Sequence, residues 1–139
     1  MDQGGVVRDE DDGLARFRSE IAAFYAGFGQ PELLVAAFEG AALFVPLAEG
    51  DRVFTSEFGG VHWVCAFTSP EELARYWARR GGVDPRAEYR YHTLRGHRLA
   101  EYASARAEPT GVMVDAVGAA PIAFPPRVSE GAEAVVGVL

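Results

Sequence analysis

Apolar residues at helical spacing open the patterned part of the chain. Between 14 and 28 they recur every three or four positions, at Leu14, Phe17, Ile21, Phe24 and Phe28. This is the spacing of one helix face, with Asp12 suited to the N-cap and Gly27 to the end. The stripe either docks on the chain's own core or, as heptad positions, packs on another subunit. The polar, acidic residues 1–12 are predicted to be disordered.

A second helix is predicted to begin at Pro31, because proline suits the first helical position and Glu32 suits the first turn. Three strand-like runs follow, at 42–47, 52–58 and 61–68. The first contains Pro46, which places it at an edge or ends it there. Gly59-Gly60 predicts a hairpin. The third run is apolar on both faces, which is typical of a central strand. We therefore expect a meander of three antiparallel strands.

The clearest local signal is Ser69-Pro70-Glu71-Glu72, which reads as a capping box opening a helix. Alternating apolar segments after it predict a strand at 88–93, a helix at 95–105 and strands at 112–114 and 121–124. Together these elements predict an α+β fold. It has a single domain with a central, mostly antiparallel sheet of about five strands and helices packed on it. The domain spans 13–127, and 128–139 form a C-terminal tail.

Composition and charge restrict the partners. The formal net charge is −7, which disfavours nucleic acid and anionic membranes. All 13 basic residues are arginine, so lysine chemistry is excluded. Arginine-, alanine- and glycine-rich usage suggests a high-GC bacterial, actinobacterial source. With one cysteine, no signal peptide and no membrane-length apolar run, we expect a cytoplasmic protein without an internal disulfide.

Reactive constellations are not evident in the sequence. The zinc candidates Cys65, His62, His92 and His97 fall on different faces or elements. Cys65 lies among apolar neighbours, as expected of an inert core thiol. Asp115 follows a buried strand, where it either begins a loop or serves as an acid. We therefore predict no catalytic residue, no metal and no cofactor.

Three segments resemble the N-terminal domain of SseB-like proteins, the enhanced-serine-sensitivity family often labelled type III secretion SseB-like. They are Val45-Pro46-Leu47, the run from Cys65 to Leu73 that contains Phe-Thr-Ser-Pro-Glu-Glu-Leu, and Gly111-Val112-Met113-Val114-Asp115. The likeness covers about residues 30–127. The family tends to show Asn-Pro after the third segment, and Ala116 departs from that. The resemblance implies an α+β domain with no established enzymatic activity and no catalytic residues.

The leading functional hypothesis is a non-enzymatic protein–protein interaction or regulatory domain, because aromatic residues dominate binding hot spots. One alternative is a homo-oligomeric adaptor, chaperone or immunity-type protein that uses the first helix. Another is a small-molecule-binding domain or undetected enzyme with a pocket near His92, His97, Arg95 or Asp115. The candidate contacts with a protein partner or a second copy are Leu14, Phe17, Ile21, Phe24, Phe54, Trp63, Tyr76 and Trp77.

Overall fold

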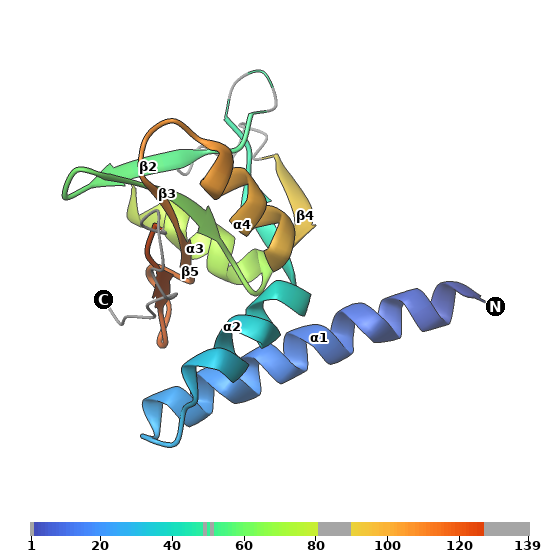
Figure 1. Cartoon of the computed structure of the whole chain (residues 1–139). Coiled ribbons are helices and arrows are strands. Elements are labelled where there is room, and N and C mark those ends of the chain that lie inside the picture. The colour runs from blue at the N-terminus through green and yellow to red at the C-terminus, as the bar shows by residue number, and fades with distance from the viewer. Residues whose placement is uncertain (1, 49, 51, 81–89, 127–139) are drawn as a thin grey trace.

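Two helices joined by a short turn lie side by side beneath the strands (Figure 1). The computed structural model describes residues 2–48, 50, 52–80 and 90–126, with side chains from Asp12 onward. The elements, in chain order, are α1 (Asp2–Tyr25), α2 (Pro31–Gly40), β1 (Ala42–Pro46), β2 (Thr55–Phe58), β3 (Val61–Ala66), α3 (Pro70–Arg79), β4 (Tyr91–Arg95), α4 (Gly96–Ala105), β5 (Thr110–Val114) and β6 (Ile122–Phe124).

Helix α1 begins earlier than the sequence predicts. It starts at Asp2, so residues 2–12 are helical rather than disordered, and this N-terminal half projects beyond α2 and the sheets (Figure 1). Extending a helix from a turn that is already docked costs little. The end is as predicted: the helix stops at Tyr25, and Gly27 adopts a φ of +89°.

The strands form two sheets, one of two strands and one of four. The four-stranded sheet has the order β2-β3-β5-β6, with β3 and β5 parallel and the other neighbours antiparallel. Strand β3 is therefore central, as its apolar faces predict. The hairpin at Gly59-Gly60 is also present, with φ values of +64° and +80°.

The predicted meander is wrong at β1. This strand pairs antiparallel with β4, from Ala42 opposite Arg95 to Pro46 opposite Tyr91. Among the described residues, an isolated bridge between Phe44 and Phe67 and a hydrogen bond from the Phe54 N–H to the Pro46 carbonyl connect it to the region of the larger sheet. Its run of apolar residues predicted a strand, but the choice of partner depends on packing between segments far apart in the chain. The α+β class is confirmed, with the strands divided between two sheets instead of one sheet of five.

The predicted cap of α3 is half formed. The Ser69 hydroxyl accepts the Glu72 N–H at 3.2 Å, which satisfies one of the free donors at the helix start. The Glu72 carboxylate, which a full capping box would turn back toward Ser69, instead pairs with Arg75 at 2.8 Å. Of the two reciprocal bonds of a capping box, only the one accepted by Ser69 is present.

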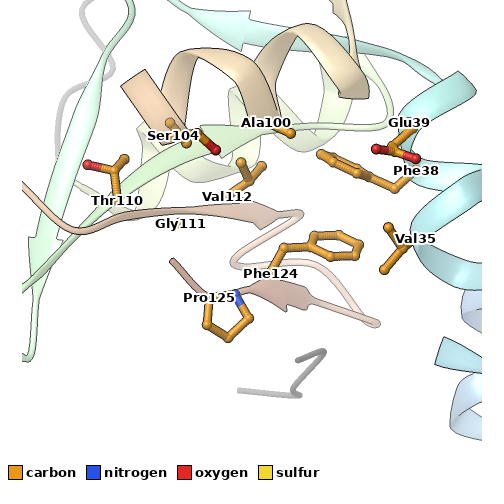
Figure 2. Close-up of a pocket in the computed structure, with 11 residues that line it drawn as sticks. Val35, Phe38, Glu39, Ala100, Ser104, Thr110, Gly111, Val112, Phe124 and Pro125 are labelled. Atoms are coloured by element: carbon orange, nitrogen blue, oxygen red, sulfur yellow. The ribbon is translucent and has the colours of Figure 1, made fainter. Parts of the chain in front are cut away.

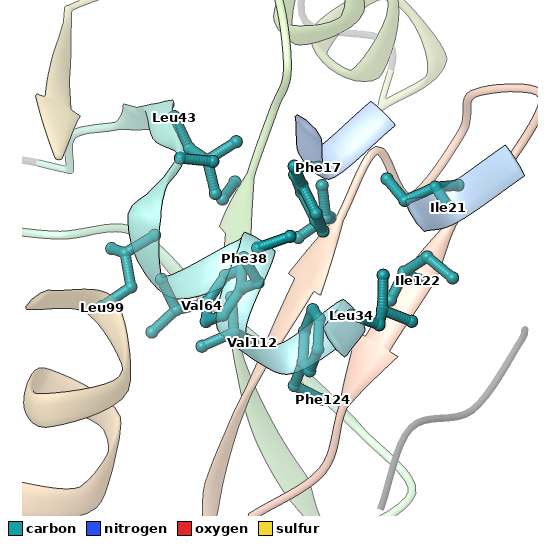
Figure 3. Close-up of a cluster of buried hydrophobic side chains, with 14 of the residues drawn as sticks. Phe17, Ile21, Leu34, Phe38, Leu43, Val64, Leu99, Val112, Ile122 and Phe124 are labelled. Carbon is teal, nitrogen blue, oxygen red and sulfur yellow. The ribbon is translucent and has the colours of Figure 1, made fainter. Parts of the chain in front are cut away.

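The main core joins α1 and α2 to the four-stranded sheet (Figure 3). Phe38 lies at its centre: its ring stacks on Phe124 at 4.3 Å between centroids and meets Phe17 edge-on at 5.9 Å. A second cluster around Cys65, Phe67, Leu73 and Tyr76 fixes α3. In the part of the chain that the structure describes, no helix is both long and apolar enough to cross a bilayer. The predicted tail at 128–139 lies outside the described residues.

Candidate functional site

Most of the predicted contact residues belong to the core. Phe17, Ile21 and Tyr76 are buried, so a partner cannot reach them while the fold is intact. The others are half-buried: Leu14 and Phe24 pack on the main core, Phe54 and Trp77 on the second cluster, and Trp63 on the backbone of Gly111. The stripe of α1 thus docks on its own fold.

The large apolar side chains that do reach solvent are different ones. Phe28 is 81% exposed and lies in the turn between α1 and α2, where Tyr25 (43%) and Leu33 (47%) are its neighbours in sequence. Phe58, at the β2–β3 hairpin, is 76% exposed. The sequence counted Phe28 as part of the α1 stripe, but the helix ends three residues before it and the side chain leaves the core.

Cys65 is held among aromatic rings. Its thiol donates to the Tyr76 hydroxyl at 3.7 Å, and Arg80 donates to the same hydroxyl at 3.2 Å. The Arg80 guanidinium also stacks on the Phe54 and Tyr76 rings, 5.2 and 5.5 Å from their centroids. Burial raises the pKa of the Cys65 thiol, and burial with the neighbouring Cys65 raises the pKa of Tyr76 to about 12. A thiol that resists ionisation is a poor nucleophile.

Asp115 lies where the parallel strands β3 and β5 end, the usual place for ligands in parallel sheets. Its carboxylate accepts the backbone N–H of Thr68 at 2.9 Å and the Thr68 hydroxyl at 2.7 Å. Burial raises the pKa of Asp115; the negative charge of Glu72 adds to this, and the bonds from Thr68 and the charge of Arg18 oppose it. Since both oxygens bind one residue of the same chain, Asp115 holds the loop in place.

The other ionisable candidates, which are Arg95 and the three histidines, lie on different elements. Arg95 donates to the Gly40 carbonyl at 2.6 Å, and Nδ1 of His97 lies 3.3 Å from the Glu39 carbonyl. His92 is exposed on β4, and His62 pairs with Glu57 at 3.5 Å. Among the described residues, no three His, Cys, Asp or Glu side chains are grouped to hold a metal.

A narrow pocket opens between α2, α4, β5 and β6 (Figure 2). Its volume is about 50 Å³. Its apolar walls come from Val35, Phe38, Val112, Phe124 and Pro125, and its rim from Glu39, Ala100, Ser104 and Thr110. Figure 2 shows Phe38 and Phe124 turned toward one another on one side and Thr110 and Ser104 on the other.

An open groove of about 510 Å³ adjoins this pocket along α4. Glu39, Ala100 and Ser104 line both, so the two form one recess. The groove adds His97, Glu101 and Ala105. The sequence pattern did not predict this recess. Its only local signal is the run of small residues Ala100, Ala103 and Ser104 on one face of α4, which leaves room for a ligand.

No protein-family model, no curated protein and no solved structure matches this chain. The function is therefore argued from the recess, its charges and the exposed side chains.

Proposed function

We propose that this protein is a non-enzymatic protein-interaction domain. It binds a peptide segment of its partner, with one apolar side chain in the pocket and the flanking residues along the α4 groove. The observation that carries the proposal is the continuity of pocket and groove through Glu39, Ala100 and Ser104. A small apolar pocket beside an open groove can bind one buried side chain of a peptide, while the rest of the peptide lies along the groove.

The pocket is large enough for one amino-acid side chain but too small for a whole drug-sized molecule. At about 50 Å³ it is well below the roughly 300–1,000 Å³ of drug-sized ligand sites. One water needs about 10–15 Å³, so the pocket has room for about three to five waters, or for a small aliphatic side chain. Phe38, Val112 and Phe124 supply the apolar contact for valine, leucine or isoleucine.

The reactive side chains support a non-enzymatic role. Cys65 is buried against Tyr76, and Asp115 is occupied by two bonds from Thr68. Neither residue lines the pocket or the groove. The recess itself offers Glu39, Glu101, His97 and the exposed Ser104 hydroxyl, which suit recognition by hydrogen bonds and charge.

A random peptide library displayed on phage tests the proposal. We expect selection to enrich peptides that share one aliphatic position, and the residues lining the recess to shift in NMR spectra on titration with a selected peptide. Ser104→Trp fills the rim from an exposed helix position and abolishes binding. Arg98→Trp, exposed on the same helix but outside the recess, is the matched control and retains it.

A library that yields no peptide sensitive to Ser104→Trp would refute this function. Circular dichroism and the urea midpoint of both tryptophan variants verify that the fold is intact. A selected peptide that shifts residues elsewhere and ignores Ser104→Trp would place the binding surface outside the recess.

The exposed turn between α1 and α2 supports a second candidate, self-association. Tyr25, Phe28 and Leu33 expose apolar surface near one another in sequence, and Phe28 is 81% exposed. Sedimentation velocity over a range of concentrations tests it: a dimer should form, and Phe28→Ser should abolish it. Phe58→Ser removes an equally exposed ring from the opposite hairpin and should leave the dimer unchanged. A monomer at all concentrations would exclude this candidate.

We also propose that the chain is an SseB-like domain of a cytoplasmic bacterial protein. The order of α2, β1, β3, α3 and β5 supports the family, because each quoted segment lies on the element expected of it. A superposition on an experimental SseB-like structure tests this: a shared strand order β2-β3-β5-β6 would support it, and a different order would refute it.

A further inference from the structure

We infer that the recess selects a basic residue next to the apolar anchor, so that the partner segment carries arginine or lysine beside valine, leucine or isoleucine. The inference rests on the proposed function and names the partner's chemistry. It follows from two carboxylates that face the groove from different elements, Glu39 on α2 and Glu101 on α4.

The position of Glu39 links charge to the anchor. Glu39 lines both pocket and groove, whereas Glu101 lines the groove alone. A peptide whose aliphatic side chain enters the pocket therefore passes Glu39 first and Glu101 beyond it. An arginine at a flanking position reaches these carboxylates while the anchor stays in the pocket, against Phe38 and Phe124. Arginine suits them best, because its planar guanidinium can pair with a carboxylate through two hydrogen bonds.

The carboxylates are available for a partner. Within the described part of the chain, neither Glu39 nor Glu101 takes part in an ion pair. The nearby cationic and imidazole groups of the chain bind backbone instead: Arg95 contacts the Gly40 carbonyl, and His97 lies beside the Glu39 carbonyl. The recess therefore has two carboxylates at its surface that form no ion pair with these groups.

Two further features favour a basic partner. Glu39 lies in the last turn of α2, where the helix dipole places partial negative charge. The whole chain carries a formal net charge of −7, which attracts basic segments and repels acidic ones. Such complementarity raises association rates and selects the partner more than it adds affinity.

The probe is the strongest peptide from the phage library, compared with a version whose basic residues are replaced by glutamine. We expect the glutamine peptide to bind the wild-type protein about 2- to 5-fold more weakly for each residue replaced, the effect of one partly exposed ion pair. Glu39→Gln and Glu101→Gln should each weaken the basic peptide by a similar factor and leave the glutamine peptide unaffected. Glu32→Gln, at the other end of α2 and outside the recess, is the matched control and should bind like wild type.

The salt dependence of peptide binding distinguishes the contribution of the charged residues from that of the apolar anchor. Raising ionic strength from about 0.02 to 0.2 M should weaken basic-peptide binding to the wild type more than to the double glutamine variant, because salt screens exposed charges. Selected peptides without basic residues, or a double variant that prefers the basic peptide as strongly as the wild type does, would overturn the inference while leaving the proposed function intact. If none of the selected peptides lost binding to the Ser104→Trp variant, the proposed function itself would be refuted. If the protein formed a concentration-dependent dimer that Ser104→Trp disrupted and Arg98→Trp did not, the recess would bind a second copy of the chain. That result would overturn the inference.

Discussion

Asp115 accepts two hydrogen bonds from Thr68, one from the backbone N–H at 2.9 Å and one from the hydroxyl at 2.7 Å. The pair joins the β3–α3 junction to the loop after β5, two segments 47 positions apart in the chain. Asp115 also has a φ of +53°, a left-handed conformation that aspartate tolerates better than most residues. The fold depends on this pair to hold the ends of the two parallel strands together.

Removing the Thr68 hydroxyl tests this dependence. Thr68→Val keeps the shape but leaves the buried carboxylate with one bond in place of two, so we expect the free energy of unfolding to fall by about 1–3 kcal/mol. Urea denaturation measures the change. Thr93→Val makes the same substitution at an exposed position of β4 and should be close to neutral. Equal stability of the two variants would contradict the role of the pair.

The Asp115 carboxyl also predicts a pH dependence. Its pKa is raised above the ordinary value of 3.8, mainly by burial. The folded state therefore binds this proton more tightly than the unfolded state. The resulting stabilisation is full below the ordinary value and is lost as pH rises through the folded pKa. The difference in unfolding free energy between wild type and Asp115→Asn should thus shrink as pH rises above the ordinary pKa of 3.8 and through the folded pKa.

Urea titrations at several pH values measure this difference. Glu71→Gln removes one exposed carboxylate from α3 and controls for the change in net charge. A difference that grows with pH would show that Thr68 and Arg18, which favour the ionised form of Asp115, outweigh burial and the charge of Glu72. A constant difference would show that these opposing effects cancel.

The contact between α2 and α4 requires glycine at position 96. A Cβ at this position would lie much closer to the Phe38 carbonyl oxygen than van der Waals contact allows. Because that oxygen belongs to the backbone of α2, the clash could be relieved only by moving the helix. Gly96→Ala should therefore destabilise the protein by about 1–3 kcal/mol or more, the cost of overpacking. In contrast, a Cβ at Gly40 meets nothing within 4 Å, so Gly40→Ala should be neutral or slightly stabilising. Thermal melting of both variants checks the contrast, and similar melting temperatures would contradict it.

Phe17 decides whether the α1 stripe serves the fold or an interface. The side chain is 0% exposed and packs against Phe38. Phe17→Ala should cost about 3–5 kcal/mol in unfolding free energy, as expected for an aromatic core residue. Leu33→Ala, at a position 47% exposed, should cost much less. A stable Phe17→Ala monomer that has only lost self-association would show instead that the stripe forms a subunit interface.

Signals that act over a few residues predicted much of the fold. Pro31 marks the start of α2, Ser69 caps α3, and Gly59-Gly60 closes the β2–β3 hairpin. Each of these depends on backbone conformations and hydrogen bonds between near neighbours, which the residue types alone determine. The burial of β3 on both faces was likewise visible in its composition.

The candidate site could not be predicted in this way. Its walls come from α2, α4, β5 and β6, and no local pattern shows that Val35, Phe124 and Ser104 line one pocket. The one local indication, small residues on a face of α4, is equally typical of close helix packing. The predicted aromatic contacts failed for the same reason: whether Phe17 or Phe28 reaches solvent depends on where α1 ends and what packs against it.

The sequence by itself therefore determined the class, most element boundaries and which strand is central, because these follow from periodicity, caps and turns. Only the tertiary structure decided that β1 pairs with β4, that β3 runs parallel to β5, and that a recess remains beside α4. These features depend on which distant surfaces bury one another at the same time, and that choice is made by the whole packed chain.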